Sequence, residues 1–421
     1  SVTLTWNKNS ETDVSQYVVY RHTASFTPAA AYVIDTVATN THTSTGLNNA
    51  TRYYFRVTAL NSSGYEGSAA AIDITPTYTG PVWYVAVADS GGSDSNEGSE
   101  ASPLLTFSKA WEKASSGDTI LIGDGTYSGS NYRDLDISGG KALLIKSRNG
   151  PDKVIFDAGK FGRHLDIKLN DPTENIDSTF VIEGITFING GSNEYGGSIR
   201  ISGGNFWDPN TQQSTNKFIS PKFVNCIFRN NSTTRYGGAV YIYEANPIFE
   251  SCVFDSNTVT TIATVAGGAY GGAVYVGRGS PQFRNSTFSA NKADGKHPGT
   301  SNGGYYPSEG GAIYFGSQDT TSTKIINCTF KNNAVNMVYG SPNGGAIYFG
   351  SLYNISSHHD GNQYIMDRST FHGNIVSSPA SSSSRGSAIY VRAPSTITNS
   401  LFYDNTSQST QYSFGGAIGI D

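Results

Sequence analysis

Short stretches in which apolar and polar residues alternate fill most of the chain. In residues 2–6 and 53–59, every second position is apolar or aromatic. An alternation with period two is typical of β-strands that bury one face. We therefore expect residues 1–78 to form a small β-sandwich. Residues 79–82, where Gly and Pro interrupt the pattern, are expected to be a linker.

From residue 180 onward the sequence repeats itself, with two elements in strict alternation. One is Gly-Gly-Ala-(Ile/Val)-Tyr-(Phe/Ile/Val), at 237–242, 271–276, 310–315 and 344–349, with degenerate copies at 196–201, 386–391 and 415–420. The other is Phe-x-x-Asn, at Phe228/Asn231, Phe254/Asn257, Phe288/Asn291, Phe330/Asn333, Phe371/Asn374 and Phe402/Asn405. An apolar residue and a small residue precede each Phe at fixed spacing. Every unit therefore supplies three short apolar strands separated by turns.

Three strands per repeat, none of which buries its apolar face alone, predict a parallel β-helix. Stacked coils would place Phe, Ile and Val in an inner column, and the recurring Asn side chains would hydrogen-bond to one another along the axis. The glycine pairs allow backbone dihedral angles that a side chain forbids at a sharp corner. Because the period varies, the extra residues should leave one corner as loops suited to recognition, at 258–270, 292–309, 334–343 and 375–385.

The predicted fold class is all-β, with a β-helix over residues 83–421 and its repeats over 180–421. An amphipathic helix over about 103–116, opened by Pro103, would cap the first coil and cover its strand edges. The sequence stops inside a repeat and shows no closing cap. We therefore expect the natural protein to extend further.

Composition supports many short strands and tight turns. Only 14% of the 421 residues are charged, against roughly 25% in ordinary soluble domains, while Gly, Tyr and Phe are abundant. The formal net charge is −5 and no basic stripe occurs, so a nucleic-acid partner is not expected. No apolar run approaches the roughly 20 residues that span a bilayer.

The first segment resembles a fibronectin type III domain in the run Leu47-(x5)-Tyr53-x-Phe55-x-Val57-x-Ala59-x-Asn61, followed by Gly64 and Glu66. The resemblance implies that Tyr53 is the corner tyrosine whose hydroxyl ties a loop back to the sheet. It also implies that the first strand is missing, because Trp6 stands where the second strand should be. Such modules usually act as spacers or binding surfaces, so no catalysis is assigned to this segment.

Two further resemblances cover residues 82–421. The chain resembles the first coils of secreted bacterial right-handed β-helix proteins, which include polysaccharide lyases. The resemblance rests on Gly92-Ser93-Asp94-Ser95-Asn96-x-Gly98, Pro103, Lys109-Ala110, Gly117-Asp118-Thr119-Ile120 and Gly125-Thr126-Tyr127. The Gly-Gly-Ala-Ile-Tyr and Phe-x-x-Asn pairs resemble the repeats of chlamydial polymorphic outer-membrane proteins, which are surface adhesins. These resemblances imply a right-handed β-helix that is secreted or at the cell surface. They leave the function open, since this scaffold hosts both enzymes and binders.

Catalytic residues are not evident in the repeats. A lyase needs a base and a cation that holds the substrate carboxylate, and a hydrolase needs two acids at a defined separation. The acids after residue 180 share no repeat position, and the Asn-Thr-Asp, Asp-Asp, Gly-His-Gly and Arg-Ile-Lys signatures of polygalacturonases are missing. We therefore assign no catalytic residue from the sequence.

Metal ligands are sparse. Asp89, Asp94 and Asn96 surround a glycine-rich turn and are weak Ca²⁺ candidates, although turn formation explains them too and the spacing is not that of an EF-hand loop. His358-His359-Asp360 is interpreted as a solvated loop. Three cysteines share their repeat position with serines, which indicates small buried residues with free thiols: Cys226, Cys252 and Cys328.

A row of tyrosines is the most suggestive surface. In the Gly-Gly element, period two places the fourth and sixth residues inside the coil and the fifth outside. We therefore expect an outward ladder of Tyr241, Tyr275, Tyr314, Tyr348 and Tyr390. Stacked tyrosines suit sugar faces or another protein surface, but they also stabilise a sheet beneath loops.

Two functions from different classes fit these patterns. The first is an extracellular or cell-surface protein, adhesin-like or structural, that binds glycans or forms part of a filament. Its partners would be a polysaccharide, a host or neighbouring cell surface, or further copies of the chain. The second is a carbohydrate-active enzyme of the polysaccharide lyase type. A groove lined by a Lys or Arg and at least two acids on neighbouring coils would favour the enzyme.

Overall fold

The computed structural model describes residues 2–47, 51–76, 80–192, 195–208, 212–261, 268–295, 307–316, 323–337, 340–350, 364–378, 383–409 and 412–420. The chain forms two compact units, Ser1–Thr79 and Gly80–Asp421. Strands dominate both of them, as the alternating pattern predicts.

The first unit is a sandwich of two antiparallel sheets. β1 (Val2–Thr5) pairs with β4 (Thr41–Ser44), and the other sheet has the order β3-β2-β5-β6. Its strands are β2 (Val14–His22), β3 (Val33–Val37), β5 (Tyr53–Asn61) and β6 (Ala70–Ile74), with a 3₁₀ turn at Ala30–Tyr32. Leu4, Val19, Tyr53 and Phe55 form its buried core. Tyr53 is thus buried at the start of β5, while the loop contact of its hydroxyl stays a prediction.

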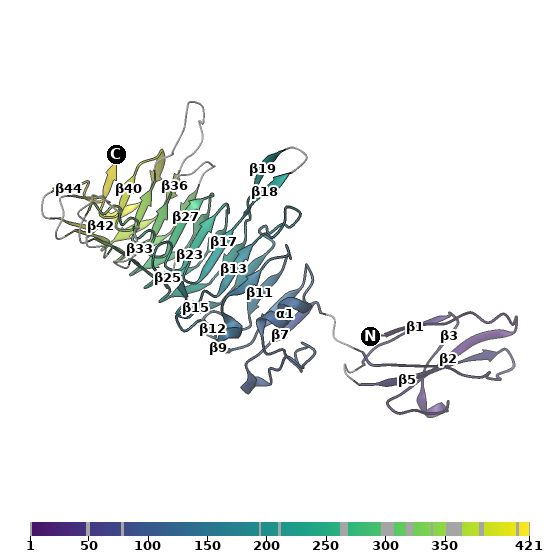
Figure 1. Ribbon diagram of the computed structural model, residues 1–421. Helices are drawn as coiled ribbons and strands as arrows, with labels where there is room; N and C mark the ends of the chain where they lie inside the picture. The colour runs from purple at the N-terminus through teal and green to yellow at the C-terminus, as the bar shows by residue number, and fades with distance from the viewer. Residues whose placement is uncertain are drawn as a thin grey trace. The chain divides into compact units, whose positions relative to one another are not determined.

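The second unit is a right-handed parallel β-helix (Figure 1), in which the chain passes from sheet to sheet and returns one coil later. Sheet I comprises β7 (Val82–Val85), β8 (Thr119–Ile122), β11 (Leu144–Ser147), β14 (Val181–Glu183), β20 (Lys222–Val224), β24 (Ile248–Glu250), β28 (Gln282–Arg284), β32 (Lys324–Ile326), β36 (Tyr364–Asp367) and β41 (Ser395–Thr398). Sheet II comprises β9 (Gly125–Ser128), β12 (Val154–Asp157), β15 (Thr186–Ile188), β21 (Ile227–Arg229), β25 (Val253–Asp255), β29 (Thr287–Ser289), β33 (Thr329–Lys331), β37 (Thr370–His372) and β42 (Leu401–Tyr403).

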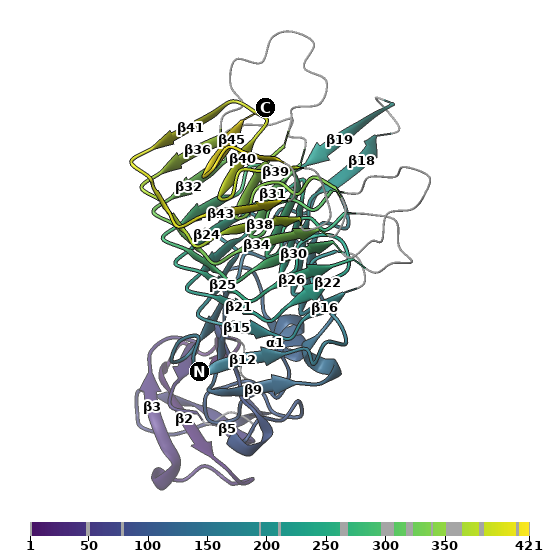
Figure 2. The ribbon, with the colours of Figure 1, turned by 90° about the vertical axis from the view of Figure 1, so that its left-hand side faces the viewer.

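Two more parallel sheets complete the coils (Figure 2). Sheet III comprises β16 (Gly191–Ser192), β22 (Ser232–Thr233), β26 (Thr258–Thr260), β30 (Lys292–Gly295), β34 (Ala334–Met337), β38 (Ile375–Ser378) and β43 (Thr406–Ser409). Sheet IV comprises β10 (Leu135–Ile137), β13 (Leu165–Lys168), β17 (Ile199–Ser202), β23 (Val240–Tyr243), β27 (Val274–Arg278), β31 (Ile313–Phe315), β35 (Ile347–Phe349), β40 (Ile389–Val391) and β45 (Ile418–Ile420). A short parallel pair, β39 (Ser383–Arg385) and β44 (Tyr412–Phe414), and the projecting hairpin β18 (Gly204–Asp208) and β19 (Gln213–Lys217) lie outside these sheets.

The expectation of three strands per coil is wrong from β16 onward, because sheet III adds a fourth strand. The segments that follow the Phe-x-x-Asn element do not leave the coil at once, but first add a strand to sheet III. Their central residues are fully buried, as Val259, Ala293 and Val335 show. A single apolar residue flanked by polar ones is too short a pattern to predict a strand from sequence. The expected loops therefore begin as strands β26, β30, β34 and β38.

A short helix lies before the first complete coil. α1 spans Phe107–Lys113, with two 3₁₀ turns nearby at Ala88–Ser90 and Ser130–Tyr132. The helix is shorter than the range 103–116 expected from sequence. Leu104 is held in a bridge with Val85 in sheet I, and the Thr106 side chain caps the helix by accepting from the Lys109 N–H at 3.2 Å. The N-cap is therefore Thr106 and not the region of Pro103.

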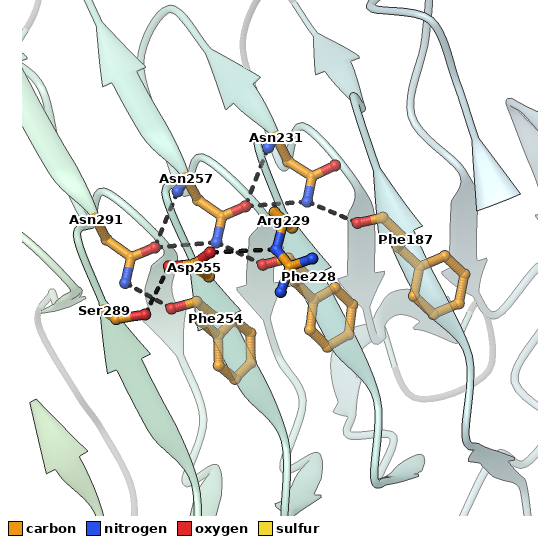
Figure 3. Close-up of polar contacts among 9 residues, drawn as sticks. All are labelled: Phe187, Phe228, Arg229, Asn231, Phe254, Asp255, Asn257, Ser289 and Asn291. Carbon is orange, nitrogen blue, oxygen red and sulfur yellow. Dashed lines mark hydrogen bonds and ion pairs between the residues drawn. The ribbon is translucent and has the colours of Figure 1, made fainter. Parts of the chain in front are cut away.

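The Asn residues of the Phe-x-x-Asn element form a buried hydrogen-bond ladder along the axis (Figure 3). From Asn231 to Asn374, each Nδ2 donates to Oδ1 of the Asn one coil later and also to the carbonyl of the Phe one coil earlier. For Asn291 these distances are 2.9 Å to Asn333 and 2.9 Å to Phe254. Its Oδ1 accepts from the backbone N–H and the Nδ2 of Asn257, both at 3.0 Å. Both donors and the acceptor of the amide are thus satisfied where water is excluded.

The Phe side chains of the same element form the inner column. Their rings stack at 4.6–5.4 Å between centroids, in the order Phe187, Phe228, Phe254, Phe288, Phe330, Phe371 and Phe402. Two coils before Asn231, the fully buried His164 lies with its Nε2 3.0 Å from the carbonyl of Phe156, as the Asn Nδ2 atoms lie by the later Phe carbonyls. Burial lowers the pKa of His164 to about 4. The imidazole is therefore neutral and structural at ordinary pH.

The two glycines of each pair serve different purposes. The first has a left-handed backbone, with φ of 65° at Gly271 and 67° at Gly310, a region that favours glycine. The second lies against the next coil, because a Cβ added at Gly272 would stand 2.1 Å from the carbonyl oxygen of Gly311. The sequence predicts the dihedral requirement, while the close approach appears only once the coils are stacked.

The ladder gives a direct test of the fold. The Asn291→Asp substitution keeps the shape of the side chain but places an oxygen against two acceptors, the Oδ1 of Asn333 and the carbonyl of Phe254. We expect it to lower the free energy of unfolding by about 3 kcal/mol, measured by denaturant unfolding of the full chain. The control is Asn285→Asp, an exposed turn residue with φ of 52° whose Oδ1 accepts from Asn327. Equal stability of the two variants would contradict the ladder's importance.

Candidate functional site

The predicted tyrosine ladder lies on the outward face of sheet IV, in register along five coils. Its members are Tyr241, Tyr275, Tyr314, Tyr348 and Tyr390. Neighbouring ring centroids are 5.0–5.7 Å apart, and the first three pairs are parallel within 10°. Val240 and Ile242 point into the core, as the alternation predicts. The ladder is a continuous aromatic stack.

A second row of tyrosines packs against the ladder. Tyr195, Tyr236 and Tyr270 stand directly before the glycine pairs and form bridges from coil to coil. Their rings meet the ladder at an angle, with 4.7 Å between the centroids of Tyr236 and Tyr275. This row was not predicted from the sequence, although its signal, Tyr-Gly-Gly, recurs three times. The outward face of sheet IV is therefore two aromatic rows wide.

This packing limits what the ladder can contact. Each inner ring has its flat faces occupied by the rings above and below, so only edges and hydroxyls face outward. Tyr241, Tyr275 and Tyr314 are half-buried, while Tyr348 and Tyr390 are only 5% and 2% exposed. Burial raises the pKa of Tyr348 to about 12. The more exposed part of the ladder is its first three tyrosines.

A buried carboxylate continues the second row. Glu309 bridges Tyr270 and Asn343 in the row and is only 6% exposed. Its Oε1 accepts from Asn343 Nδ2 at 2.9 Å. Burial raises the pKa of Glu309 to about 7, with Asn343 and Arg392 acting in the opposite direction. Glu309 is therefore a proton-binding group inside the aromatic face.

The first coils of the same face carry charges instead of tyrosines. Asp136 and Asp166 are register neighbours on β10 and β13, and Arg200 follows Asp166 on β17. Arg200 binds both oxygens of Asp166, at 2.6 and 2.5 Å, and Lys168 lies 2.8 Å from Asp136. The recurring Leu-Asp-Ile at 135–137 and 165–167 is the signal that could have found this cluster from sequence. It was missed because it precedes the repeats.

Ion pairing decides what this cluster can do. Burial acts to raise the pKa of Asp136, but hydrogen bonds from Lys168 and Ser138 outweigh it and the pKa is lowered. Asp166 is held in a two-point ion pair, and the Arg200 guanidinium keeps its charge because that pair raises its pKa. A hydrolase needs one carboxyl that keeps its proton near neutral pH. The cluster brings two acids and two cations together on neighbouring coils, with both acids held in ion pairs. Asp136, with its lowered pKa, does not suit the role of proton donor.

The calcium candidates hold a turn. Both oxygens of Asp94 are engaged by donors, with Oδ1 accepting from the Thr106 N–H at 2.8 Å and Oδ2 from the Thr106 hydroxyl at 2.8 Å. Asn96 donates from Nδ2 to the carbonyls of Gly91 and Pro103, while Asp89 is exposed. Among the described residues, no group of three or more His, Cys, Asp or Glu side chains could hold a metal ion.

The three cysteines and the segment His358-His359-Asp360 are the remaining features singled out in the sequence. The three cysteines are buried and free, which confirms that expectation. Burial raises the pKa of Cys328 to about 12, so its thiol is inert at ordinary pH. His358-His359-Asp360 lies outside the described residues.

Family comparisons match two parts of the chain. Residues 1–75 match the fibronectin type III domain. Residues 225–243 and 327–350 match the Chlamydia polymorphic membrane protein repeat, a repeat family associated with the bacterial outer surface. The resemblances to these two families found in the sequence are thereby confirmed. None of the helices in the described part of the chain has the length and apolar character needed to cross a bilayer.

Solved structures with a similar course of the chain are carbohydrate-active proteins. A rhamnogalacturonan lyase is 13% identical over 79% of this chain and 87% of its own, with a TM-score of 0.30. The family 28 exopolygalacturonase of Yersinia enterocolitica is 12% identical over 99% and 96%, with a TM-score of 0.18. The GH136 lacto-N-biosidase of Eubacterium ramulus is 12% identical over 80% and 67%, with a TM-score of 0.23. No curated protein matches the chain. At such low identities and TM-scores, these structures carry no functional argument.

Glu309 gives a pH-dependent prediction. Its pKa is near 7 in the folded chain and about 4.5 when exposed, so the folded state binds the proton more tightly. Stability should therefore be full below about pH 4.5 and fall as the pH rises to about 7. We expect the stability of Glu309→Gln relative to the wild type to rise by roughly 3 kcal/mol between pH 4.5 and 8. Denaturant unfolding at both pH values measures this change, and exposed Glu100→Gln is the control.

Proposed function

We propose that this chain is a cell-surface, adhesin-like β-helix that presents the aromatic face of sheet IV to a polysaccharide or to a neighbouring cell surface. The observation that carries the proposal is the double tyrosine row, which runs in register along successive coils. The match of the repeats to a family from the bacterial outer surface supports this location. The fibronectin type III unit serves as a spacer.

The chemistry of the face suits repetitive contact. Tyrosine hydroxyls donate and accept hydrogen bonds, and the ring edges next to them are apolar. Since Tyr241, Tyr275 and Tyr314 occur at equal register on successive strands, their hydroxyls follow one line. A polymer with regularly spaced hydroxyl groups fits such a line better than a compact ligand does. Binding would then be the sum of several weak contacts.

A triple substitution tests the proposal without disturbing the stack. Changing Tyr241, Tyr275 and Tyr314 to Phe removes the hydroxyls and keeps the rings. We expect adhesion of the coated protein to bacterial cells and to immobilised polysaccharides to fall at least tenfold, with the thermal unfolding midpoint unchanged. Tyr65→Phe, an exposed residue of the first unit, is the control. Undiminished adhesion of the triple variant would overturn the role of this face.

A carbohydrate-active enzyme of the polysaccharide lyase type is the second candidate. The observation that favours it is the presence of Asp136, Asp166 and two cations on neighbouring coils of one face. In such a reaction a base removes the proton beside the sugar carboxylate, the C–O bond to the next sugar breaks, and the leaving oxygen takes up a proton. The product is an unsaturated sugar, and no further reactant is needed.

Product formation separates the two candidates. Incubation with acidic polysaccharides should yield unsaturated ends, seen by ultraviolet absorbance, if the chain is a lyase. The Asp166→Asn variant should then lose this activity, because its bond to Arg200 is weakened. We expect no product from the wild type, and unsaturated ends formed by the wild type but not by the variant would establish the enzyme.

A further inference from the structure

A polar hollow opens where sheet III begins. It has a volume of about 590 Å³ and is lined by Asp134, Lys160, Phe161, Arg163, Ser192 and Thr234, among others. The preceding coil passes from β12 to β13 through residues 158–164 without a sheet III strand. Sheet III therefore starts only at β16. The hollow therefore lies beside β16, the first strand of sheet III. Beyond β16, toward the first coils, the described residues add no further strand to sheet III (Figure 2). We call this cavity the basic hollow.

Two cations of the basic hollow are not held in a direct ion pair. Within the described part of the chain, neither Lys160 nor Arg163 forms an ion pair, whereas Lys168 and Arg200 nearby are both paired. Lys160 Nζ donates to the carbonyl of Asn230 and lies 3.5 Å from the Ser232 hydroxyl. Arg163 donates from Nη2 to Ser192 at 3.3 Å, and its buried Nη1 has no hydrogen-bond partner. A buried donor in that state is stabilised when an acceptor reaches it.

The electrostatics of the basic hollow favour an anion. Burial lowers the pKa of Lys160. Burial and the neighbouring Arg200 lower the pKa of Arg163 and outweigh the opposite effect of Asp166 and Asp134. Both shifts mean that the charged forms are held without adequate compensation. The one carboxylate in the lining, Asp134, accepts from the backbone N–H of Arg163 at 3.2 Å and forms no direct ion pair with either cation.

An exposed aromatic ring stands at the edge of the basic hollow. Phe161 lies between the two cations in sequence and is 80% exposed, the most exposed large apolar side chain of the described residues. The Arg133 guanidinium lies 5.4 Å from the centre of its ring and adds a further positive charge. Lys160, with φ of 68°, has a left-handed backbone in the turn that precedes this ring. A simple inorganic anion would use the two cations but not the exposed ring of Phe161. The ring therefore points to a ligand that also has an apolar face.

We propose that the basic hollow binds a carboxylate-bearing sugar unit of an acidic oligosaccharide. Arg163 and Lys160 hold the carboxylate, and the ring of Phe161 packs against the face of the sugar. Hydroxyl groups of the lining, such as those of Ser232 and Thr260, offer partners to the hydroxyls of the sugar. The site uses none of the tyrosines of sheet IV, so it stands even if that face binds nothing.

Oligogalacturonate is the probe, because its methyl ester keeps the sugar and removes the charge. We expect the full chain to bind de-esterified hexagalacturonate in titration calorimetry, and the methyl-esterified form at least tenfold more weakly. Arg163→Gln and Lys160→Gln should each weaken binding of the acid form about tenfold, since each removes a charged hydrogen bond. Phe161→Ala should weaken it severalfold without a change in the unfolding midpoint, because this ring is exposed.

The controls separate the proposal from general charge attraction. Lys153→Gln removes an exposed cation that lies before β12 and outside the lining of the hollow, and this variant should bind as the wild type does. Sodium acetate at matched carboxylate concentration should compete only weakly. Equal binding of the esterified probe, equal binding by Arg163→Gln and Lys153→Gln, or acetate binding as tight as that of the oligomer would each overturn the proposal. If Arg163→Gln does not fold, Lys160→Gln and Phe161→Ala decide.

Discussion

The hydrogen bonds between buried Asn side chains at one corner of the coil are the interaction on which the β-helix depends. Each coil turns from sheet II toward sheet III at this corner, where backbone carbonyls would otherwise face the core without donors. The Asn amides supply those donors and link to the next coil in the same step. A one-residue slip of any coil would leave an amide and a carbonyl unpaired, at a cost of several kcal/mol. The ladder therefore fixes the register for all four sheets.

Register in turn decides where the aromatic rings lie. With the corner fixed, equal positions of consecutive coils are direct neighbours, so the Phe rings stack inside and the tyrosine rings stack outside. The same rule acts on the first coils, where equal positions hold Asp136, Asp166 and Arg200 in place of tyrosine. There the stack becomes a row of ion pairs. One geometric constraint thus yields an aromatic surface at one part of sheet IV and a charged one at another.

The sequence predicts the repeat far better than the parts that depart from it. The Gly-Gly and Phe-x-x-Asn elements predict the coils, the inward Phe column and the outward tyrosines, because each rests on local spacing. The strands of sheet III, from β16 onward, could not be predicted, since their only signal is one buried residue such as Val259. The basic hollow depends on the late start of sheet III, a long-range feature that no short motif around Lys160 and Arg163 encodes. The row of tyrosines before the glycine pairs was present in the sequence and was overlooked.

The uniform ladder also makes each coil an interchangeable unit. From Asn231 to Asn333, each coil meets the next through the same amide, the same ring and the same glycine contact. Excision of residues 258–291 would leave Asn257 directly before Lys292 and beneath Asn333, so the row of amides would close again without a gap. Duplication of such a segment would lengthen the rod by one turn with no new kind of contact. Sequences of this design can change their reach in whole-turn steps while the chemistry at either end stays the same.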